Sequence, residues 1–388
     1  MKGKNLIVIS VILASTLGGT ALAKGGNVEE CKYESGKNYL MENYAKEKHS
    51  YKFPNKYQNE FEKITFDAEV IVDNAGELKS FYTSNAEPQR INRDKALKKF
   101  LGKENIKKVY ESEEDVKGET ISVSYEGENG NTISFGNIPS SCNYRKNGLF
   151  KYLLNAFRLQ SKDSGYNADK FSLDKEFEFS TREEAFNNIR KTLTDIGIEI
   201  GSNYKSYSLD YETMRDEEYI MDVNGNEDRS KYKPSWTEED NAYYFIINQD
   251  YEKLPTYHPY FNVFKSKEES NAPIQVVYSK NGIEYLEIEN LVDFSSKNSE
   301  VEILPFENII ESINNKAFSN ENDRNFKITK MELEYMIDTY NGKKDGIYKV
   351  KPIWMVDVEE VNKEYKCEFP IIVDAATGEI IDNYCESF

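Results

Sequence analysis

Residues 348–380 read YKVKPIWMVDVEEVNKEYKCEFPIIVDAATGEI, and this stretch decides how the C-terminal part of the chain folds. It predicts one strand over Tyr348–Val358 and a second over Tyr365–Asp374. In the first of these, apolar side chains alternate along one face of the strand, namely Tyr348, Val350, Trp354 and Val356. We therefore expect Trp354 to fill a core rather than to bind a ligand.

The elements around this stretch predict an antiparallel meander covered by one helix. Ala375–Gly378 is a loop of hairpin length that leads into a last strand over Glu379–Tyr384. A further strand is expected over Ile328–Ile337. A helix should begin after Pro305 and direct apolar side chains toward the sheet, with Phe306, Ile309, Ile310, Ile313 and Ala317. Helix and meander would form an α+β layer pair.

The C-terminal segment resembles a known family in two short stretches. Lys351–Val356 and the hairpin Ile372–Ile380 resemble the PepSY domain and the related ends of extracellular sensor-kinase regulators of the YycH/YycI type. The resemblance covers roughly residues 298–388 and implies one helix packed on a short antiparallel sheet. Its signature hairpin carries Asp374, Thr377 and Gly378. Turn chemistry alone could also produce that pattern, because Asp374 can accept hydrogen bonds from the loop and Gly378 can take φ > 0. The whole chain also resembles secreted Firmicute proteins of clostridial type, a likeness that implies no activity.

Export is indicated by the first residues. Lys2 and Lys4 precede an apolar run from Leu6 to Leu17, and Ala21–Ala23 fits the site that signal peptidase cleaves. We expect residues 1–23 to be a signal peptide and the mature protein to be secreted or held at the cell surface, without a membrane span. Removal of two lysines changes the net charge from −18 to −20, which disfavours nucleic acid and anionic membranes as partners.

Four cysteines lie in the exported part, where disulfides persist, and they allow three pairings. If Asp374 faces Glu379, the residue numbers of every facing pair in this hairpin add up to 753. The numbers of Cys367 and Cys385 add up to 752, so the two cysteines lie within one residue of facing each other. A bulge at Gly378 would remove this offset of one residue. The last hairpin therefore favours Cys367–Cys385, which leaves Cys31 with Cys142.

The remaining sequence predicts a second α+β domain. An alternating strand contains Ile64, Phe66, Ala68, Val70 and Val72, and a helix spans about Arg93 to Leu101. Gly130 would close a hairpin that pairs Val123 with Phe135. A capping box at Ser180 and Glu183 begins a helix that ends at Gly197. Further strands are expected over Tyr207–Tyr211, Glu218–Val223 and Tyr243–Ile247, and the turn Asn281–Gly282 should pair Tyr278 with Tyr285.

The resulting fold class is α+β, with antiparallel sheets each backed by one or more helices. We divide the chain into a signal peptide (1–23), an N-terminal arm (24–57), an α+β domain (58–255) and a C-terminal PepSY-like domain (256–388).

Most catalytic chemistries lack the residues they need. The chain has two histidines, His49 and His258, and no His-Glu-x-x-His helix, Gly-x-Ser-x-Gly elbow or glycine-rich phosphate loop, so we assign no catalytic residues and no cofactor. A weak calcium candidate has oxygen ligands at alternate positions, in Asp222, Asn224, Asn226 and Asp228. It lacks the glycine and the closing glutamate of a calcium loop, which favours an Asn-Gly turn instead.

Two functions remain open. The first is a non-catalytic protein that binds another extracellular or cell-surface protein, and it predicts an exposed apolar patch. The second is a secreted hydrolase of cell-wall or polysaccharide substrates, and it predicts two buried carboxylates in one cleft, at least one with a raised pKa.

Overall fold

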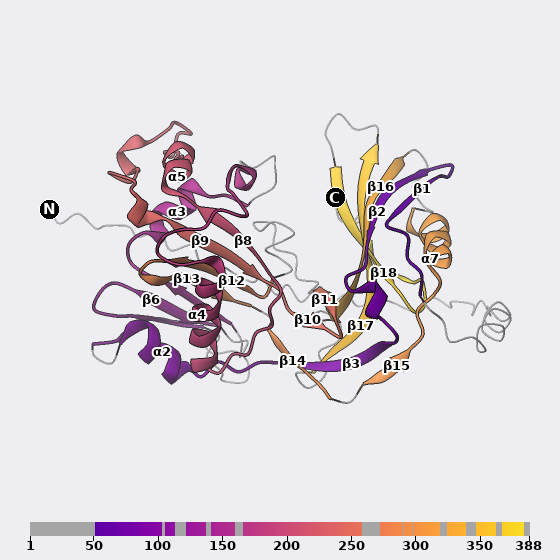
Figure 1. Ribbon diagram of the computed structural model, residues 1–388, viewed down its shortest axis with the longest axis horizontal. Helices are drawn as coiled ribbons and strands as arrows, with labels where there is room; N and C mark the ends of the chain where they lie inside the picture. Colours follow the sequence, from indigo (N-terminus) through magenta and orange to yellow (C-terminus); the bar gives the residue numbers. More distant parts are fainter. Residues whose placement is uncertain are drawn as a thin grey trace, which may run out of the picture. The chain divides into compact units, whose positions relative to one another are not determined.

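The computed structural model describes residues 51–102, 105–112, 122–136, 141–159, 166–257, 272–289, 291–296, 298–318, 324–338, 347–361 and 367–383. In this part of the chain the fold is α+β, and its strands form two sheets of eleven and eight strands (Figure 1). The predicted signal peptide and residues 24–50 of the predicted arm lie outside the described residues.

The eleven-stranded sheet contains strands from both ends of the chain. Its central order is β1-β2-β16-β17-β18-β19, and shorter strands extend it. The strands are β1 (Lys56–Glu60), β2 (Ile64–Ile71), β3 (Phe81–Pro88), β10 (Asp250–Tyr251), β11 (Leu254–Tyr257), β14 (Val292–Phe294), β15 (Ser299–Val301), β16 (Asn325–Asp338), β17 (Tyr348–Val361), β18 (Cys367–Asp374) and β19 (Ile380–Asn383). The predicted meander is present as β16 to β19. The sheet is mixed rather than antiparallel throughout, because β2 and β11 both pair with β16 in parallel.

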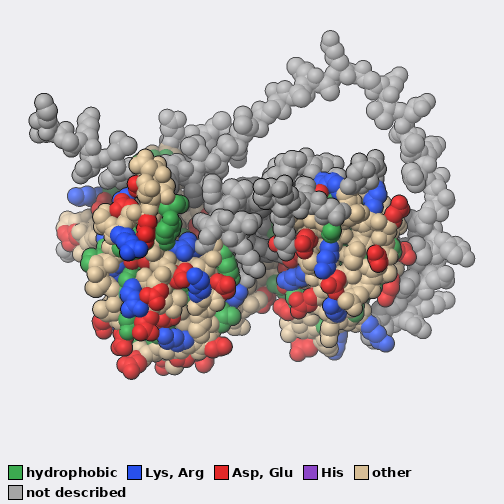
Figure 2. Space-filling model, turned by 90° about the horizontal axis from the view of Figure 1, so that it is seen from above, with side chains coloured by type: hydrophobic (Ala, Val, Ile, Leu, Met, Phe, Trp, Pro, Cys, Tyr) green, Lys and Arg blue, Asp and Glu red, His purple; other side chains and the backbone are tan. Residues whose placement is uncertain are grey.

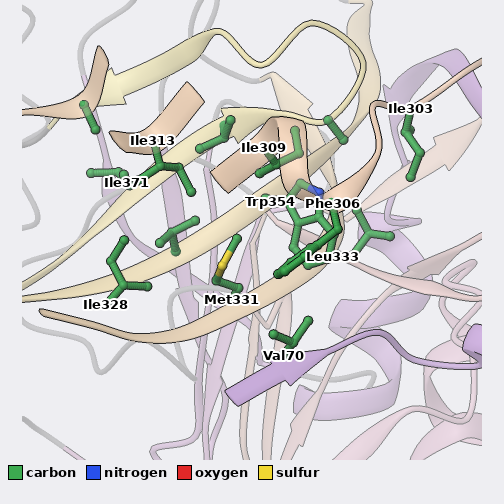
Figure 3. Close-up of a cluster of buried hydrophobic side chains, with 14 of the residues drawn as sticks. Val70, Ile303, Phe306, Ile309, Ile313, Ile328, Met331, Leu333, Trp354 and Ile371 are labelled. Carbon is green, nitrogen blue, oxygen red and sulfur yellow. The ribbon is translucent and has the colours of Figure 1, made fainter. Parts of the chain in front are cut away.

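One helix covers this sheet, as predicted. α7 (Phe306–Ser312) continues as a π-helical segment, Ile313–Ala317, and buries the predicted apolar face. Figure 3 shows Phe306 and Ile309 beside Trp354 of β17 and Leu333 of β16. Trp354 is fully buried and its ring meets that of Phe306 edge to face at 5.5 Å. Each large apolar side chain buried in this way stabilises the fold by about 1.5–3 kcal/mol.

The eight-stranded sheet has the order β4-β5-β6-β7-β13-β12-β9-β8. Its strands are β4 (Lys107–Glu111), β5 (Val123–Glu126), β6 (Thr132–Phe135), β7 (Cys142–Arg145), β8 (Tyr204–Leu209), β9 (Ala242–Ile247), β12 (Ile274–Ser279) and β13 (Gly282–Ile288). The predicted pairing of Val123 with Phe135 is confirmed, with Gly130 at φ 72°.

Helices pack on both faces of this sheet. α2 (Arg93–Leu101) and α4 (Arg182–Asp195) share a core with alternate residues of β9, Tyr243, Phe245 and Ile247. α3 (Phe150–Ala156) and α5 (Tyr211–Glu217) share a second core with Tyr244 and Ile246. All six residues of β9 are therefore buried, since neither face of the strand meets solvent. Short 3-10 helices add Ala75–Glu77, Ala168–Lys170, Arg229–Lys231 and Glu238–Asp240.

The two sheets do not divide at the predicted boundary between residues 255 and 256. β12 and β13 follow that boundary but belong to the eight-stranded sheet, whereas β2 and β3 precede it and pair with β16 and β17. The turn-rich sequence around Pro255 marks the passage of the chain through β10 and β11. It does not mark the end of a sheet.

Three local predictions need correction. The capping box lies one residue later, because Thr181 rather than Ser180 accepts the hydrogen bond of the first turn, from the amide of Glu184. The hairpin of β12 and β13 pairs Val277, not Tyr278, with Tyr285, since the loop is Lys280–Asn281 and a bulge follows. Tyr211–Glu217 is helical and Glu218–Val223 is not a strand of either sheet, because Asp210 caps a helix by accepting from the amide of Thr213.

Candidate functional site: an apolar hairpin tip

Four exposed apolar side chains lie on α3 and on the segment that follows α5. Their exposed fractions are 58% for Leu154, 46% for Tyr219, 59% for Met221 and 101% for Val223. The backbone amide of Tyr219 donates to the carbonyl of Asn155 at 3.0 Å, which places the start of the hairpin beside Leu154 of α3. We call these four residues the apolar tip. Large exposed apolar patches mark interaction sites, and single exposed apolar residues do not.

A buried carboxylate closes the base of the hairpin that carries the tip. Glu218 is 6% exposed and accepts hydrogen bonds from the indole Nε1 of Trp236 at 2.8 Å and from the amide of Lys233 at 2.9 Å. The ammonium of Lys233 lies over the Trp236 ring and pairs with Asp240 at 2.8 Å. These contacts join the two ends of the segment 218–233, so the tip projects from a fixed base.

Backbone hydrogen bonds then define a short hairpin within this segment. The amide of Asp222 donates to the carbonyl of Asn226 at 2.7 Å, and the amide of Asp228 donates to that of Ile220 at 2.8 Å. Gly225 takes φ 82°, a left-handed value that the turn requires. Tyr219 and Met221 lie at alternate positions on the outgoing arm of this hairpin, and Val223 lies in its turn.

The weak calcium candidate falls in this turn, and its first carboxylate is occupied by the protein itself. Oδ1 of Asp222 accepts from the amides of Asn224 at 2.8 Å and Asn226 at 2.9 Å. The two backbone amides hold the pKa of Asp222 below its usual value. No cluster of three or more metal-ligating side chains occurs among the residues that the structure describes. The amide of Gly225 donates to the carbonyl of Asp222 at 3.1 Å, which gives the segment the geometry of an Asn-Gly turn.

The basic side chains of the hairpin are paired with its own acids. Arg229 lies 3.0 Å from Glu227, and Lys231 lies 2.9 Å from Asp228. Figure 2 views the molecule from above Figure 1, from the side on which α3 and α5 lie, and shows acidic and basic side chains interspersed with smaller apolar areas. These ion pairs engage the charged side chains of the hairpin with one another. The described part of the hairpin supplies no partner for its exposed apolar side chains.

Three buried carboxylates elsewhere, those of Glu284, Glu360 and Asp374, have structural partners. Glu284 accepts from the hydroxyl of Ser279 at 2.6 Å. Glu360 accepts from Arg324 at 2.8 and 2.5 Å, and Asp374 pairs with Lys351 at 2.9 Å.

Two carboxyl groups of the described residues have a raised pKa, those of Asp250 and Asp293. Burial raises the pKa of Asp250, and the charge of Asp73 adds to it. Burial also raises the pKa of Asp293, with contributions from Glu87 and Glu199. Each of the two groups therefore has at least one other carboxylate close enough to raise its pKa.

The signature hairpin has the local geometry expected from its sequence. Oδ1 of Asp374 accepts from the amides of Ala376 and Thr377, each at 3.0 Å, and Gly378 takes φ 66°. The amide of Asp374 donates to the carbonyl of Glu379 at 2.8 Å, which is the expected facing pair.

Neither described cysteine is bonded to another cysteine: Cys142 is buried and Cys367 is partly exposed. Cys31 and Cys385 lie outside the described residues, so both pairings stay predictions. The bulge of the last hairpin lies between Ile372 and Val373 rather than at Gly378, and beyond it the paired numbers sum to 754, as for Ile371 with Asn383. Cys367 would lie opposite Cys385 only if the paired numbers summed to 752. The observed register is therefore further from this arrangement than the predicted one.

Burial of Cys142 constrains any partner thiol. Cys142 is 2% exposed in the core beneath α2 and α4, and this burial raises the pKa of its thiol to about 12. A bridge requires the two Cβ atoms to lie about 3.5–4.5 Å apart. Cys31 would therefore have to enter that core.

No helix in the described part of the chain is both long enough and apolar enough to cross a bilayer.

The comparisons with known proteins identify the fold but no family. No protein-family model matches the chain and no curated protein matches its sequence. The crystal structure of an uncharacterized protein from Eubacterium rectale aligns with a TM-score of 0.58 at 20% identity, over 85% of this chain and 94% of that one. The C-terminal domain of YpeB from Bacillus megaterium aligns over 76% of this chain and 97% of that domain, at 11% identity and a TM-score of 0.25 that supports no argument. The chain is thus similar in fold to the Eubacterium rectale protein.

Proposed function

We propose that this chain is a secreted, non-catalytic protein that binds another protein at the cell surface through the apolar tip. The observation that carries the proposal is the exposure of Tyr219, Met221 and Val223 on a hairpin whose base is closed by buried Glu218. Presenting apolar groups on a fixed scaffold lowers the entropy cost of binding.

The C-terminal part of the proposal is a PepSY-like module. α7 packed on the β16–β19 meander, with Asp374 and Gly378 in the terminal turn, supports that assignment. The alternative is a carboxylate-dependent hydrolase, for which Asp250 and its neighbour Asp73 are the candidate acids.

Site-specific photo-crosslinking on intact cells of the producing bacterium tests the proposal. The mature protein carries a benzophenone amino acid at Val223, and the matched control carries it at Val361, a 40% exposed residue of β17. We expect a discrete crosslinked species from position 223 that is absent from position 361 and is lost when Met221→Asp is added. Turnover of peptidoglycan or polysaccharide without any crosslink at position 223 would overturn the proposal.

Export has its own test. N-terminal sequencing of the protein recovered from the culture medium should begin at Lys24, after the predicted cleavage site. Recovery of a chain that still begins at Met1 contradicts the predicted signal peptide.

A further inference from the structure

The β10–β11 hairpin leaves one sheet and joins the other. The strands described before and after it, β9 and β12, both belong to the eight-stranded sheet, whereas β11 pairs in parallel with β16 of the eleven-stranded sheet. β9 and β12 are antiparallel neighbours, with Ile247 opposite Ile274 where β9 ends and β12 begins. A short loop would suffice to join two such strands. The excursion through β10 and β11 therefore adds a contact between the two sheets that the eight-stranded sheet does not need for its own pairing.

Two side chains of this hairpin are buried in the core of the eleven-stranded sheet. Tyr251 is 6% exposed and Leu254 is fully buried, and both belong to the core that contains Trp354. The ring of Tyr251 lies 4.5 Å from that of Phe294 and meets the ring of Tyr335 edge to face at 4.8 Å. The hairpin is thus packed into the second core and not only paired along its edge.

The base of the hairpin is hydrogen-bonded to residues of both sheets. The side chain of Gln249 bonds both backbone groups of Val292, the first residue of β14: Nε2 donates to the carbonyl at 2.5 Å, and Oε1 accepts from the amide at 3.3 Å. On the side of the eight-stranded sheet, Asn203 precedes β8. Its Nδ2 donates to Oδ1 of Asp250 at 2.7 Å, and its carbonyl accepts from the amide of Asn248 at 3.0 Å.

The turn of the hairpin is strained. Glu252 has φ 48° and Lys253 has φ 73°, and a two-residue turn of this kind normally carries asparagine and glycine. Residues with a Cβ atom disfavour these left-handed values. Contacts from the connection between β2 and β3 hold the turn, because Nδ2 of Asn74 donates to the carbonyl of Lys253 at 2.8 Å and Glu77 pairs with the Lys253 ammonium.

We propose that the β10–β11 hairpin is a latch that couples the two sheets, and that the strain in its turn lets the latch open before either sheet unfolds. Burial of Tyr251 and Leu254 holds the latch closed. The described ladder between β11 and β16 comprises two residue pairs, so few backbone hydrogen bonds have to break when it opens. Elements of low local stability are those that move in conformational switches. The latch is independent of the apolar tip and of the proposed binding function.

The two tryptophans of the chain report on the two sheets separately. Trp236 lies in the core shared by α3 and α5, and Trp354 lies in the core of the eleven-stranded sheet. The full mature chain labelled with 5-fluorotryptophan therefore gives one fluorine resonance for each sheet, and a Trp236→Phe variant assigns them. With the latch closed, we expect both resonances to show the same midpoint of urea unfolding. Separate midpoints in the parent chain would overturn the coupling.

Two alanine variants distinguish the latch from general loss of core packing. Leu254 of the latch and Leu333 of β16 are both fully buried in the same core. Leu333→Ala should lower both midpoints together, because the latch remains in place. Leu254→Ala should release the latch and separate the two midpoints by about 0.5 M urea or more. Separation in both variants, or in neither, would overturn the coupling.

Amide hydrogen exchange tests the opening of the latch. The amide of Thr256 donates to the carbonyl of Gln249 at 2.9 Å across the hairpin, so its exchange rate reports opening. We expect this amide to exchange faster than those of the central strands β9 and β17. Lys253→Gly removes the strain and the ion pair and should slow this exchange severalfold. Lys253→Ala removes only the ion pair and should not slow it. Equal effects of the two variants, or exchange at Thr256 as slow as in β9 and β17, would overturn the strained opening.

Discussion

Gly378 is constrained in two independent ways at the scale of a single residue. Its φ of 66° is a left-handed value that costs other residues about 1–2 kcal/mol. A Cβ atom at this position would also overlap the hydroxyl oxygen of Ser312 and lie 3.2 Å from Cδ1 of Leu304. The terminal hairpin therefore packs directly against the residues that end α7, and glycine serves both the turn and this close approach.

A series of three alanine substitutions separates the two constraints on Gly378. Gly378→Ala should lower the free energy of unfolding by about 2–4 kcal/mol, the sum of backbone strain and overpacking. Gly225→Ala, at φ 82° with open space around it, should cost about 1–2 kcal/mol from strain alone. Gly201→Ala has neither constraint and should change stability by less than about 1 kcal/mol. Urea unfolding measures all three, and equal losses at positions 378 and 225 would show that the contact with Ser312 does not matter.

The carboxylate of Asp222 gives a prediction about pH. The amides of Asn226 and Asn224 hold the pKa of Asp222 below the value of about 3.9 that it has in the unfolded chain. The stabilisation from Asp222 is thus fully present above pH ~3.9 and is lost as the pH falls through the lower pKa of the folded state.

An NMR titration checks this behaviour of Asp222. The carboxyl resonance should have its midpoint below about 3.9, and the amide shifts of Asn224 and Asn226 should follow the same midpoint. Asp222→Asn keeps a neutral acceptor, so in that variant the two amides should no longer show this transition. A midpoint at or above the unfolded value contradicts the assigned hydrogen bonds.

At the scale of an element, the start of α4 shows what the sequence predicts about a helix and what it leaves undecided. Ser180 with Glu183 and Thr181 with Glu184 both fit the spacing of a capping box, so the sequence predicts the helix but not which pair forms the cap. In the structure the amide of Thr181 donates to Glu184 Oε2 at 2.9 Å, and the carbonyl of Ser180 accepts from the hydroxyl of Tyr243 at 3.0 Å. The tertiary contact with Tyr243 thus fixes Ser180 before the helix begins.

Two alanine variants distinguish the capping residues. Thr181→Ala should cost about 1 kcal/mol of unfolding free energy, the usual value of an N-cap. Ser180→Ala should cost less than about 0.5 kcal/mol, because its hydroxyl donates to the carbonyl of Thr181 and caps no amide of the first turn. Chemical denaturation of the two variants beside the parent chain measures the difference. A larger loss at Ser180 than at Thr181 would restore the earlier pair as the capping box.

The sequence did not predict the apolar tip, because alternating apolar residues occur both in strands that pack on a core and in segments that meet solvent. Tyr219, Met221 and Val223 alternate with other residues as in a half-buried strand, which is the interpretation that the sequence favoured for Glu218–Val223. In the structure no sheet receives this segment, since α5 occupies Tyr211–Glu217 and redirects the chain. Alternation predicts that such side chains share one side of an extended backbone, whereas Val223 lies in the turn. It does not reveal whether that side meets a core or solvent.

Long-range pairing sets the limit of prediction for the whole molecule. The meander β16–β19 and α7 follow from local patterns, and the sequence predicted both. The parallel pairing of β2 with β16, from Ile64 opposite Phe326 to Ile71 opposite Glu332, joins segments more than 250 residues apart and has no local signal. The C-terminal sheet is therefore completed by residues that the sequence assigned to another domain.

This pairing predicts that residues 298–388 do not fold alone, although they contain every element of the PepSY-like resemblance. The fragment lacks β2, whose Ile64, Phe66 and Val70 are at most 6% exposed in the core beneath α7. Loss of three such side chains removes about 5–8 kcal/mol, which is comparable with the whole stability of an ordinary domain. Circular dichroism and amide shift dispersion of the isolated fragment should therefore show an unfolded chain.

A peptide of residues 51–88, which supplies β1, β2 and β3, should restore the amide shift dispersion of the fragment, and the same peptide with Phe66→Asp should not. Cooperative unfolding of the fragment by itself would show that the meander and α7 suffice, and that β2 is an addition to a complete domain.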